Sequence, residues 1–492
     1  MNSGPTLSIG ATGHDVRRLQ RIFVMTKALV SSDITGSFDV TTEQAVKDFQ
    51  QGANLTVDGI VGPATWQALP ADPDKPVFGR SRVSYGREEC VALPPAPGTD
   101  IDSDRKDDED ALCKIKFDDP NVIFCPALHS TNPGTDIYEL PTGVSRASFE
   151  QKECSKETGR NADFLAKFKQ STSCSYTPAI LAYGKLADAL KIHVDVPAVV
   201  YRTMEQATHK GVEKMADVYA HGLIKQTWAG LVSKIAASST KVMKDGLLYG
   251  AMVDHKGGID HHPTLNHRGP DPNPAAPFLA SSTWAMATKG SEIRSQIPPS
   301  LETLGQMMAV RDVGEMAIID HILAQQDRFG NVAKKETVFW LEQTAAGQKL
   351  HSVKATKANK PIDGTNQTTM EYLNANHIPY VQFPVMVLAD NDCGLRQDSN
   401  VVRKNNMVQH LRHISSSVYK HVQSFAKTNP GDLLEYFQNQ TLMTSDEAKG
   451  VIARLQEVAS ILKTNCDNGT LLFDSKPEIF LGMEPIPPKN CE

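Results

Sequence analysis

The chain has 492 residues, too many for one hydrophobic core, and a typical domain length of roughly 150 residues predicts two to four folded units. Hydrophobic residues make up 40% of the sequence and charged residues 22%, and the formal net charge of -6 gives no basic surface for nucleic acid. The longest apolar run, residues 380–389, is about half of what a membrane span needs, so no membrane span is expected.

The first residues, MNSGPTLSIGATGHDVRRLQ, lack the charged start, apolar centre and small-residue cleavage site of a signal peptide. Export by the general secretory route is therefore not expected. Eight cysteines occur without a CxxC pair, at Cys90, Cys113, Cys125, Cys154, Cys174, Cys393, Cys466 and Cys491. Five of them lie between residues 90 and 174, so the pattern fits either free thiols or a disulfide-stapled segment of a protein that works outside the cytosol.

Residues 1–72 form a self-contained pattern of three short helices. Asp15–Met25 places apolar residues on one helical face. Thr41 or Thr42 can cap a second helix in the stretch GSFDVTTEQAVKDFQ. In DGIVGPATWQAL, a turn at Asp58 and Gly59 precedes a third helix that opens with proline.

These motifs carry a resemblance. GxxGxDVxxLQ, GxFDxxTxxAVxxFQ and VDGIVGPxTW, which together cover nearly all of residues 7–69, resemble the peptidoglycan-binding module of many cell-wall enzymes. The resemblance implies glycan binding in a groove that includes Asp58, Gly59, Ile60 and Trp66. A folding or docking unit without glycan affinity is the alternative, because a fold does not determine a function.

The rest of the chain divides by composition. Prolines and the acidic run DSDRKDDED predict a linker and irregular segment over residues 73–130. Short apolar runs alternate with turn signals over residues 131–205, and helical periodicity dominates residues 206–492. The predicted fold class is therefore multidomain α+β, in which a small three-helix bundle precedes a mixed lobe and a larger helical lobe.

The stretch QQDRFGN, residues 325–331, follows an apolar run that predicts a buried helix, and that helix would deliver Asp327 into a loop. Phosphoryl transfer needs a carboxylate that orients the acceptor hydroxyl and a carboxamide oxygen that helps to hold Mg²⁺ against the ATP phosphates. Asp327 and Asn331 supply this pair of groups.

Two further parts of such a site occur elsewhere in the chain. In PVMVLADNDCGL a buried strand ends at Asp390, the predicted metal ligand, with Asp392 as an alternative or second ligand. The strand pattern of ADFLAKFKQS puts Lys167 and Lys169 on one face, where either can bind phosphates. The position of Lys167 directly after an apolar run favours it.

Along the chain come first the strand with Lys167 and Lys169, then the loop with Asp327, named the base loop, and then the metal aspartate Asp390. This order is that of kinases. With the motifs DHILAQQDRFGN and LADNDCG, the sequence resembles the atypical kinases of the Golgi casein kinase, HipA-type toxin kinase and phosphatidylinositol kinase superfamily. Loosely spanning residues 130–425, the resemblance implies a two-lobed kinase-like domain, with an N-lobe at 131–205 and a C-lobe at 206–492. It implies ATP with Mg²⁺ or Mn²⁺ as cofactors and a protein hydroxyl as acceptor.

Two departures from the kinase pattern stand out. The helix that opens at Thr177 has no Glu between residues 179 and 190 to pair with the lysine, although Asp188 is present. Gly143 in PTGVSRASF could sit in a loop over the phosphates, but one glycine is a weak signal for such a loop. A pseudokinase, or a nucleotidyl transferase on the same scaffold, is therefore an alternative.

The stretch DHKGGIDHHPTLNH supports a different hypothesis, a zinc-dependent cell-wall hydrolase. Its candidate ligands are Asp254, His255, Asp260, His261, His262 and His267. The spacing matches no HExxH pair, and the other interpretation is a polar loop inserted in the kinase-like domain.

We expect a bacterial protein made in the cytoplasm and secreted by a signal-peptide-independent route as an effector. Its expected partners are a protein substrate of a host or neighbouring cell and, through the first module, peptidoglycan or a secretion apparatus. A cytosolic enzyme whose module has lost glycan affinity is the alternative.

Overall fold

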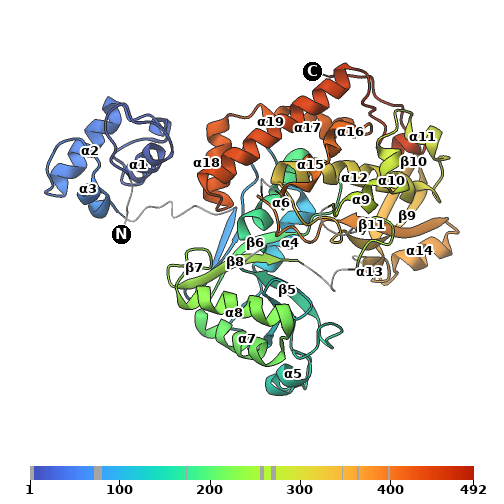
Figure 1. Cartoon of the computed structure of the whole chain (residues 1–492), viewed down its shortest axis with the longest axis horizontal. Coiled ribbons are helices and arrows are strands. Elements are labelled where there is room, and N and C mark those ends of the chain that lie inside the picture. The colour runs from blue at the N-terminus through green and yellow to red at the C-terminus, as the bar shows by residue number, and fades with distance from the viewer. Residues whose placement is uncertain are drawn as a thin grey trace.

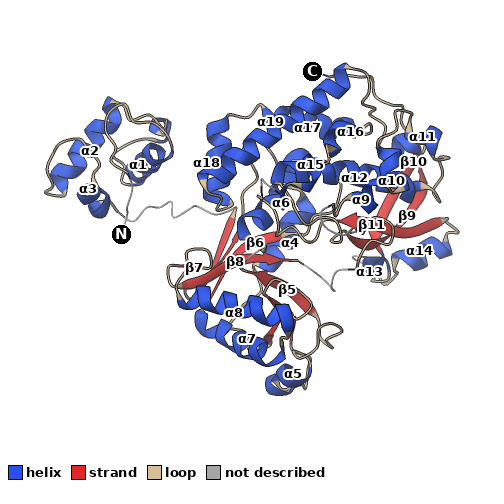
Figure 2. Cartoon of the chain, viewed as in Figure 1, coloured by secondary structure: helices blue, strands red, loops and turns tan. Residues whose placement is uncertain are grey.

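The computed structural model describes residues 5–70, 80–172, 174–254, 260–267, 273–345, 347–362, 365–396 and 399–491. Along the chain lie a small helical module, a part built on an eight-stranded sheet and a mainly helical part with a three-stranded sheet (Figures 1 and 2). The predicted α+β class and the separate helical module agree with this arrangement. Within the described residues, no helix combines the length and apolarity needed to span a bilayer.

The module contains α1 (His14–Met25), the 3-10 helix η1 (Ser31–Asp33), α2 (Val40–Gly52) and α3 (Pro63–Ala68). Two glutamines fix its turns in the same way. The Oε1 atoms of Gln20 and Gln50 accept hydrogen bonds from the backbone N–H of Gly36 and Gly59, each at 2.9 Å, and both Nε2 atoms donate to the carbonyl of the following residue. Both glycines have positive φ, 75° and 71°, which residues with a Cβ rarely adopt.

The larger sheet is antiparallel, with strand order β1-β2-β6-β8-β5-β4-β3 and with β7 paired to β8. Its strands are β1 (Ser81–Tyr85), β2 (Glu88–Ala92), β3 (Val122–Pro126), β4 (Gly134–Glu139), β5 (Phe164–Lys169), β6 (Val199–Met204), β7 (Met243–Lys244) and β8 (Leu247–Val253). The associated helices are α4 (Ser103–Leu112), α5 (Arg146–Lys152), α6 (Thr177–Leu190), α7 (Gln206–Tyr219) and α8 (Gly222–Ala236). Helices α7 and α8 pack on one face of the sheet, and α6 packs on the other.

This sheet corrects the predicted boundaries. Residues 80–130 do not form an irregular segment, because they include β1, β2, α4 and β3, and residues 73–79 of the predicted linker lie outside the described residues. The sheet also continues past residue 205 to β8, which pairs with both β5 and β6. The acidic run taken for a solvated loop forms α4, whose N-cap Asp102 accepts a hydrogen bond from the backbone of Arg105.

The helical part begins with α9 (Ala276–Leu279), α10 (Ser282–Ala287), α11 (Ile293–Gln296) and α12 (Leu304–Leu323). The second sheet has the order β10-β9-β11 and is formed by β9 (Ala333–Thr344), β10 (Gly347–Lys354) and β11 (Tyr380–Val387), with α13 (Ala355–Ala358) and α14 (Thr369–Ala375) alongside. The chain ends with α15 (Val401–Lys404), α16 (Met407–His410), α17 (Ser416–Ala426), α18 (Pro430–Gln440), α19 (Ser445–Asp467) and α20 (Pro477–Phe480). The sequence predicted a helical lobe over residues 206–492. The three-stranded sheet within this segment is a further difference from the prediction.

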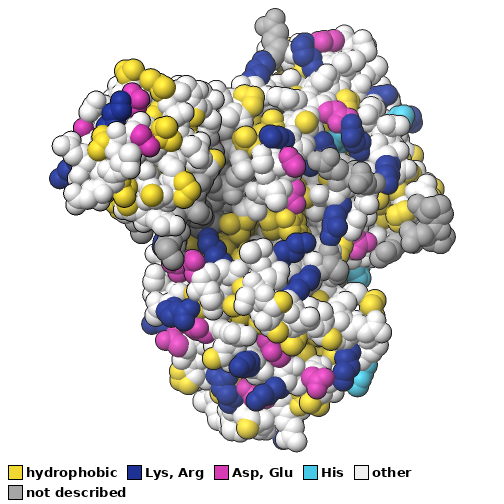
Figure 3. All heavy atoms as spheres, turned by 60° about the vertical axis from the view of Figure 1, so that its left-hand side comes forward, with side chains coloured by type: hydrophobic (Ala, Val, Ile, Leu, Met, Phe, Trp, Pro, Cys, Tyr) yellow, Lys and Arg dark blue, Asp and Glu magenta, His cyan; other side chains and the backbone are white. Residues whose placement is uncertain are grey.

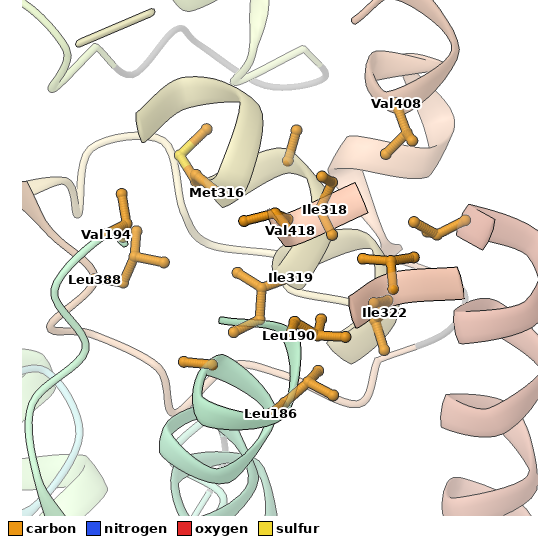
Figure 4. Close-up of a cluster of buried hydrophobic side chains, with 14 of the residues drawn as sticks. Leu186, Leu190, Val194, Met316, Ile318, Ile319, Ile322, Leu388, Val408 and Val418 are labelled. Carbon is orange, nitrogen blue, oxygen red and sulfur yellow. The ribbon is translucent and has the colours of Figure 1, made fainter. Parts of the chain in front are cut away.

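Helices α6 and α12 share the largest hydrophobic core. Figure 4 shows Leu186 and Leu190 of α6 beside Ile319 and Ile322 of α12, with Val418 of α17 close by. Helix α12 is buried over nearly its whole length, which explains why its sequence is apolar on every side. The loop that follows α12 therefore starts from a fixed point.

All eight cysteines are paired, as Cys90–Cys113, Cys125–Cys154, Cys174–Cys393 and Cys466–Cys491. The choice left open by the sequence, free thiols or disulfides, is thereby decided in favour of disulfides. Three of the bonds join residues fewer than thirty positions apart, whereas Cys174 and Cys393 are 219 positions apart.

Buried ion pairs fasten α4 to α6. Lys185 Nζ lies 2.6 and 2.9 Å from the two carboxylate oxygens of Glu109, and both side chains are almost completely buried. Arg105 Nε donates to Asp188 Oδ1 at 2.8 Å. Each buried charge is therefore stable only while its partner is present.

Replacing Lys185 with Met should lower the free energy of unfolding by about 3–5 kcal/mol, because Glu109 keeps a buried charge that has lost its main partner. Urea unfolding followed by circular dichroism measures the change. The double variant Lys185→Met with Glu109→Leu removes both charges and should recover most of the lost stability. A double variant as unstable as the single one would show that the unpaired charge is not the cause.

Candidate functional site

The candidate site lies where β5 meets the loop after β11. Lys169 Nζ is 3.0 Å from Asp390 Oδ1 and 2.7 Å from Asp392 Oδ2. The lysine is the last residue of β5, and the two aspartates follow β11 by a few residues, so segments more than 200 positions apart meet here. The structure thus brings Lys169, and not the favoured Lys167, into contact with the two carboxylates that were predicted as metal ligands.

The charges at this point are unbalanced, with two carboxylates against one ammonium group in contact with them. Burial raises the pKa of Asp390, but Lys169 more than offsets this effect and holds it well below its usual range. Burial and the neighbouring charge of Asp390 raise the pKa of Asp392. In return the two carboxylates raise the pKa of Lys169 against the effect of burial. A second cation beside the carboxylates would relieve their mutual repulsion.

Lys167 lies on the same face of β5, and its environment differs from that of Lys169. Only 4% of its surface is exposed, and it forms no hydrogen bond or ion pair with any described residue. Burial, and then the charge of Lys169, lower its pKa. Its cross-strand neighbour on β4 is Asp136, one of whose oxygens is held by Arg160 at 2.7 Å while the other, Oδ1, is buried without a partner. An anionic ligand would satisfy Lys167.

The loop after α12 is shaped by Gln325. Helix α12 stops at Ala324, which has a left-handed φ of 51°, and the Oε1 atom of Gln325 then accepts hydrogen bonds from the N–H of Gln326 and Asp327. Asn331 Nδ2 donates to the carbonyl of Asp327 at 2.6 Å, which fixes its carboxamide group. Asp327 and Asn331 are both half-buried.

Arg328 joins this loop to residues 388–396 after β11, which carry the predicted metal ligands and are named the metal loop. Its Nε and Nη2 donate to the two carboxylate oxygens of Asp320 at 2.8 and 3.0 Å, and Nη2 also donates to Asn391 Oδ1 at 2.7 Å. Tyr183 of α6 donates to the same Asp320 at 2.8 Å. Gln325 Nε2 reaches the carbonyl of Asp390 at 3.4 Å. Arg328 is therefore a buried structural junction between Asp320 of α12 and the loop after β11.

The oxygen donors fit a small hard cation that also binds phosphate. Among the described residues, no group of three or more His, Cys, Asp or Glu side chains is placed to hold a metal ion. The two carboxylates of Asp390 and Asp392 suit Mg²⁺ or Mn²⁺, because Mg²⁺ is usually bound by one or two carboxylates plus phosphate oxygens and water.

Two observations bear on the departures from the kinase pattern. Asp188, the acidic residue present in the helix that opens at Thr177, is held by Arg105 of α4. Gly143 follows β4 at the end of the sheet away from Lys169, whereas the β3–β4 turn at residues 127–133 lies at the Lys169 end, since Gly134 pairs with Lys169. A loop over bound phosphates would therefore come from residues 127–133.

The histidine-rich loop serves a structural role where it is described. His262 is buried, its Nδ1 accepts from the backbone of Thr264 at 3.3 Å, and it forms a second hydrogen bond with the backbone of Pro384. Burial lowers its pKa to about 4, so it is neutral. The backbone of Asp260 and His262 pairs with residues 332–334 beside the base loop. His255 lies outside the described residues.

The predicted glycan residues of the module differ in exposure. Trp66 is completely buried, with Nε1 donating to the carbonyl of Pro5 at 2.8 Å, so its ring cannot line a surface groove. Asp58 caps its own turn by accepting from the N–H of Ile60 at 2.8 Å. Ile60 is 39% exposed. Figure 3 shows the module projecting from the body, with hydrophobic side chains scattered on its surface.

Sequence reasoning missed the groups that support the site. Arg160 and Asp136 hold the β4–β5 face, and Asp320 anchors Arg328. The signals were present, since a charged residue inside an apolar helix, as Asp320 is, predicts a buried partner. The link between Cys174 and Cys393 carried no local signal, because the pairing of eight cysteines cannot be read from their spacing.

Replacing Arg328 with Leu should destabilise the protein by about 3–5 kcal/mol, because Asp320 would keep a buried negative charge without its cation. Denaturant unfolding measures the loss. The matched control is Arg403→Leu, which removes an exposed arginine paired with Glu457 at 3.1 Å and should cost no more than about 1 kcal/mol. Equal losses in both variants would contradict the role of Arg328 as a buried junction.

Comparison with known proteins identifies the first module. Residues 12–69 match the family described as "Putative peptidoglycan binding domain". N-acetylmuramoyl-L-alanine amidase CwlL of Bacillus licheniformis is 39% identical over 147 residues, 28% of this chain and 38% of the amidase. An uncharacterized protein in the bpoA1 3' region of Kitasatospora aureofaciens is 40% identical over 67 residues, 14% of this chain and 57% of that protein. The chain thus covers less than two thirds of either relative.

A solved structure, the crystal structure of the Golgi casein kinase, aligns over 70% of this chain and 73% of its own, with 11% sequence identity and a TM-score of 0.35. A TM-score of this size does not establish a shared fold, so any kinase chemistry has to be argued from the site residues. The chain therefore carries a peptidoglycan-binding module at its amino-terminal end, and the part that follows has a structural neighbour in the Golgi casein kinase.

Proposed function

We propose that the chain is an ATP-dependent phosphotransferase that uses Mg²⁺ or Mn²⁺ and transfers the γ-phosphoryl group to a protein hydroxyl. In this proposal the large sheet with α6 forms an N-lobe, and the helical part with the small sheet forms a C-lobe. The observation that carries it is the contact of Lys169 with both Asp390 and Asp392 beside the unpaired Lys167. This contact supports a site for a metal with phosphates.

Each side chain has a proposed role that follows from its surroundings. Asp390 and Asp392, with the carboxamide oxygen of Asn331, would hold the metal, which neutralises phosphate charge when bound. Lys167 would bind phosphate oxygens, since it is largely buried and forms no hydrogen bond or ion pair among the described residues. Asp327 would orient the acceptor hydroxyl and accept its proton.

We assign Lys169 a role other than phosphate binding alone, which is the role that the sequence predicted for a lysine on this strand. Because it already contacts both carboxylates, it sets their position and keeps Asp390 ionised. In the bound state it would also reach the phosphates from the same strand face. Lys167 and Lys169 together supply two positive charges, which offset more of the negative charge of a triphosphate than one lysine would.

The same residues would serve transfer of AMP, because that reaction differs only in which phosphorus faces the acceptor. A pseudokinase and a zinc-dependent hydrolase are further alternatives. For the hydrolase, His262 offers little support, since it is buried and its Nδ1 already accepts a hydrogen bond from the backbone of Thr264. The position of labelled phosphorus separates the two transfer reactions.

We also infer a working place outside the reducing cytosol. Four disulfides in one chain are typical of exported proteins, and the first module suggests peptidoglycan as a partner. A secreted effector that reaches its protein substrate near a cell wall fits both features. A secretion apparatus is the other partner proposed for the module.

Incubation with Mg²⁺ and ATP labelled at the α or the γ phosphate, with a mixture of proteins as acceptor, tests the proposal. We expect label from γ alone. Asp390→Asn should abolish it because one metal ligand is lost, and Asp327→Asn should lower the rate by about 10²–10⁴-fold because the acceptor proton has no base. The matched control is Lys334→Met, a lysine near the base loop that pairs with Glu336 and should retain full activity.

Each other outcome has a defined meaning. Label from the α phosphate would replace phosphoryl transfer with nucleotidyl transfer. Full labelling by a folded Asp390→Asn protein would contradict the metal assignment. No label with the wild-type protein would reject the enzyme proposal if Mn²⁺ and ATP also fail to bind.

For the module, we propose that the exposed surface around Ile60 contacts glycan. Ile60→Asp in the full chain should weaken co-sedimentation with purified peptidoglycan about tenfold, because a charge replaces an apolar contact. The control is Val40→Asp, which alters an equally apolar exposed residue roughly 15 Å along α2 from the Gln50 that holds the Ile60 turn. Equal binding by both variants would place the glycan surface elsewhere or exclude it.

A further inference from the structure

The Cys174–Cys393 disulfide lies between the parts of the candidate site. Cys174 is in the segment between Lys169 at the end of β5 and Thr177 at the start of α6. Cys393 directly follows Asp392. The bond therefore ties the strand that carries both site lysines to the loop that carries both carboxylates.

The base loop contacts the same bond. Gln326, next to Asp327, donates from Nε2 to Cys174 Sγ at 3.1 Å, and its backbone N–H donates to the carbonyl of Cys393 at 3.3 Å. Close packing adds to this contact, since a Cβ on Gly394 would lie 3.0 Å from Ala179 and 3.2 Å from the carbonyl of Leu323. Three segments thus meet at one covalent link.

We propose that this disulfide is a positioning element of the site, so that metal affinity and phosphotransfer require Cys174 and Cys393 to be oxidised. The proposal rests on the proposed function. Lys169 alone is a weak substitute for the bond, because a metal that binds Asp390 and Asp392 competes with it for the same oxygens. Without the bond, the carboxylates lose a fixed distance from the lysine strand. Groups that orient metal ligands are known to affect metal affinity strongly.

The chemistry is thiol–disulfide exchange. On formation, the two thiols lose two protons and two electrons and form the S–S bond, while a disulfide-bearing oxidoreductase or oxidised glutathione takes up the electrons and becomes two thiols. A dithiol reductant reverses the reaction. Cys174 is half-buried and can be reached by such a partner, whereas the cysteines of the Cys90–Cys113 and Cys125–Cys154 bonds are buried. The site disulfide therefore opens before those two.

The consequence is that the redox state of the compartment determines whether the site is assembled. In a reducing cytosol the metal loop is not tied to β5 and the site binds metal poorly. In an oxidising compartment the bond forms and the site is assembled. The protein substrate is then one that the enzyme meets in an oxidising compartment.

The test compares two pairs of substitutions in the full-length protein without reductant. Cys174→Ser with Cys393→Ser removes the site disulfide, and Cys466→Ser with Cys491→Ser removes a bond at the far end of α19 that is also partly accessible. Mn²⁺ affinity is measured by electron paramagnetic resonance, and KM for ATP and kcat are measured by γ-label transfer. We expect the first pair to raise the Mn²⁺ Kd and the KM for ATP about tenfold or more, and the control pair to change them less than about twofold.

Hydrogen exchange adds a readout that needs neither metal nor turnover. Residues 325–332 and 388–396 should exchange faster in the site variant and not in the control. Equal Mn²⁺ affinity and equal exchange in both variants would overturn the proposal. If the wild-type protein transfers no phosphate, the proposed function fails while Mn²⁺ affinity and exchange still decide the role of the disulfide.

If the site variant does not fold, the wild-type protein decides the question. It is equilibrated in dithiol buffers of increasing reducing power, and alkylation with mass spectrometry records which disulfide opens at each step. Loss of Mn²⁺ affinity that coincides with opening of Cys174–Cys393 supports the proposal. Loss that coincides with opening of another pair contradicts it.

Discussion

The buried positive charge of Arg328 is the constraint on which the site depends. A guanidinium group cannot lose its proton inside a protein, so the chain must surround it with oxygen atoms. Asp320 supplies two of them from α12, and Asn391 supplies one from the loop after β11. Because Tyr183 of α6 shares Asp320, one charge holds together a helix of the sheet part, the central helix of the helical part and both site loops. The positions of Asp327 and Asp390 follow from that arrangement.

The charged side chains of the candidate site fall into two groups, those with an ion-pair partner and those without one. Lys169 and the two aspartates form a compact cluster that retains one excess negative charge. Asp136 Oδ1 is buried without a partner among the described residues, and the largely buried Lys167 forms no hydrogen bond or ion pair with any of them. Buried polar groups without partners are costly unless a ligand supplies the missing contacts. The proposed binding of phosphates with a metal would supply them for Lys167.

The sequence predicted the members of the site better than the fold around it. Asp390, Asp392 and Lys169 could be singled out because Lys169 ends a strand and the two aspartates follow another strand by a few residues, positions that periodicity indicates. The preference for Lys167 over Lys169 had no firm basis in the sequence, because both share one face of β5 and only the long-range contact of Lys169 with Asp390 and Asp392 distinguishes them. Strands β1 and β2 were missed because they are short and belong to the sheet only through pairing with β6, more than 100 residues later. Trp66 was taken for a surface residue, although large aromatic side chains in small modules usually form the core.

The separation of the site residues along the chain affects how the protein is made. Lys169 and Asp390 are 221 positions apart, and the helices that complete the core around α12, such as α19, come later still. Contacts between such distant residues form late in folding, since the chain must close a long loop first. During synthesis on the ribosome, the segment with both lysines emerges long before the carboxylates that meet Lys169. A nascent or truncated chain therefore has no assembled site, and the cell that synthesises the protein is exposed to it only after the whole length has folded.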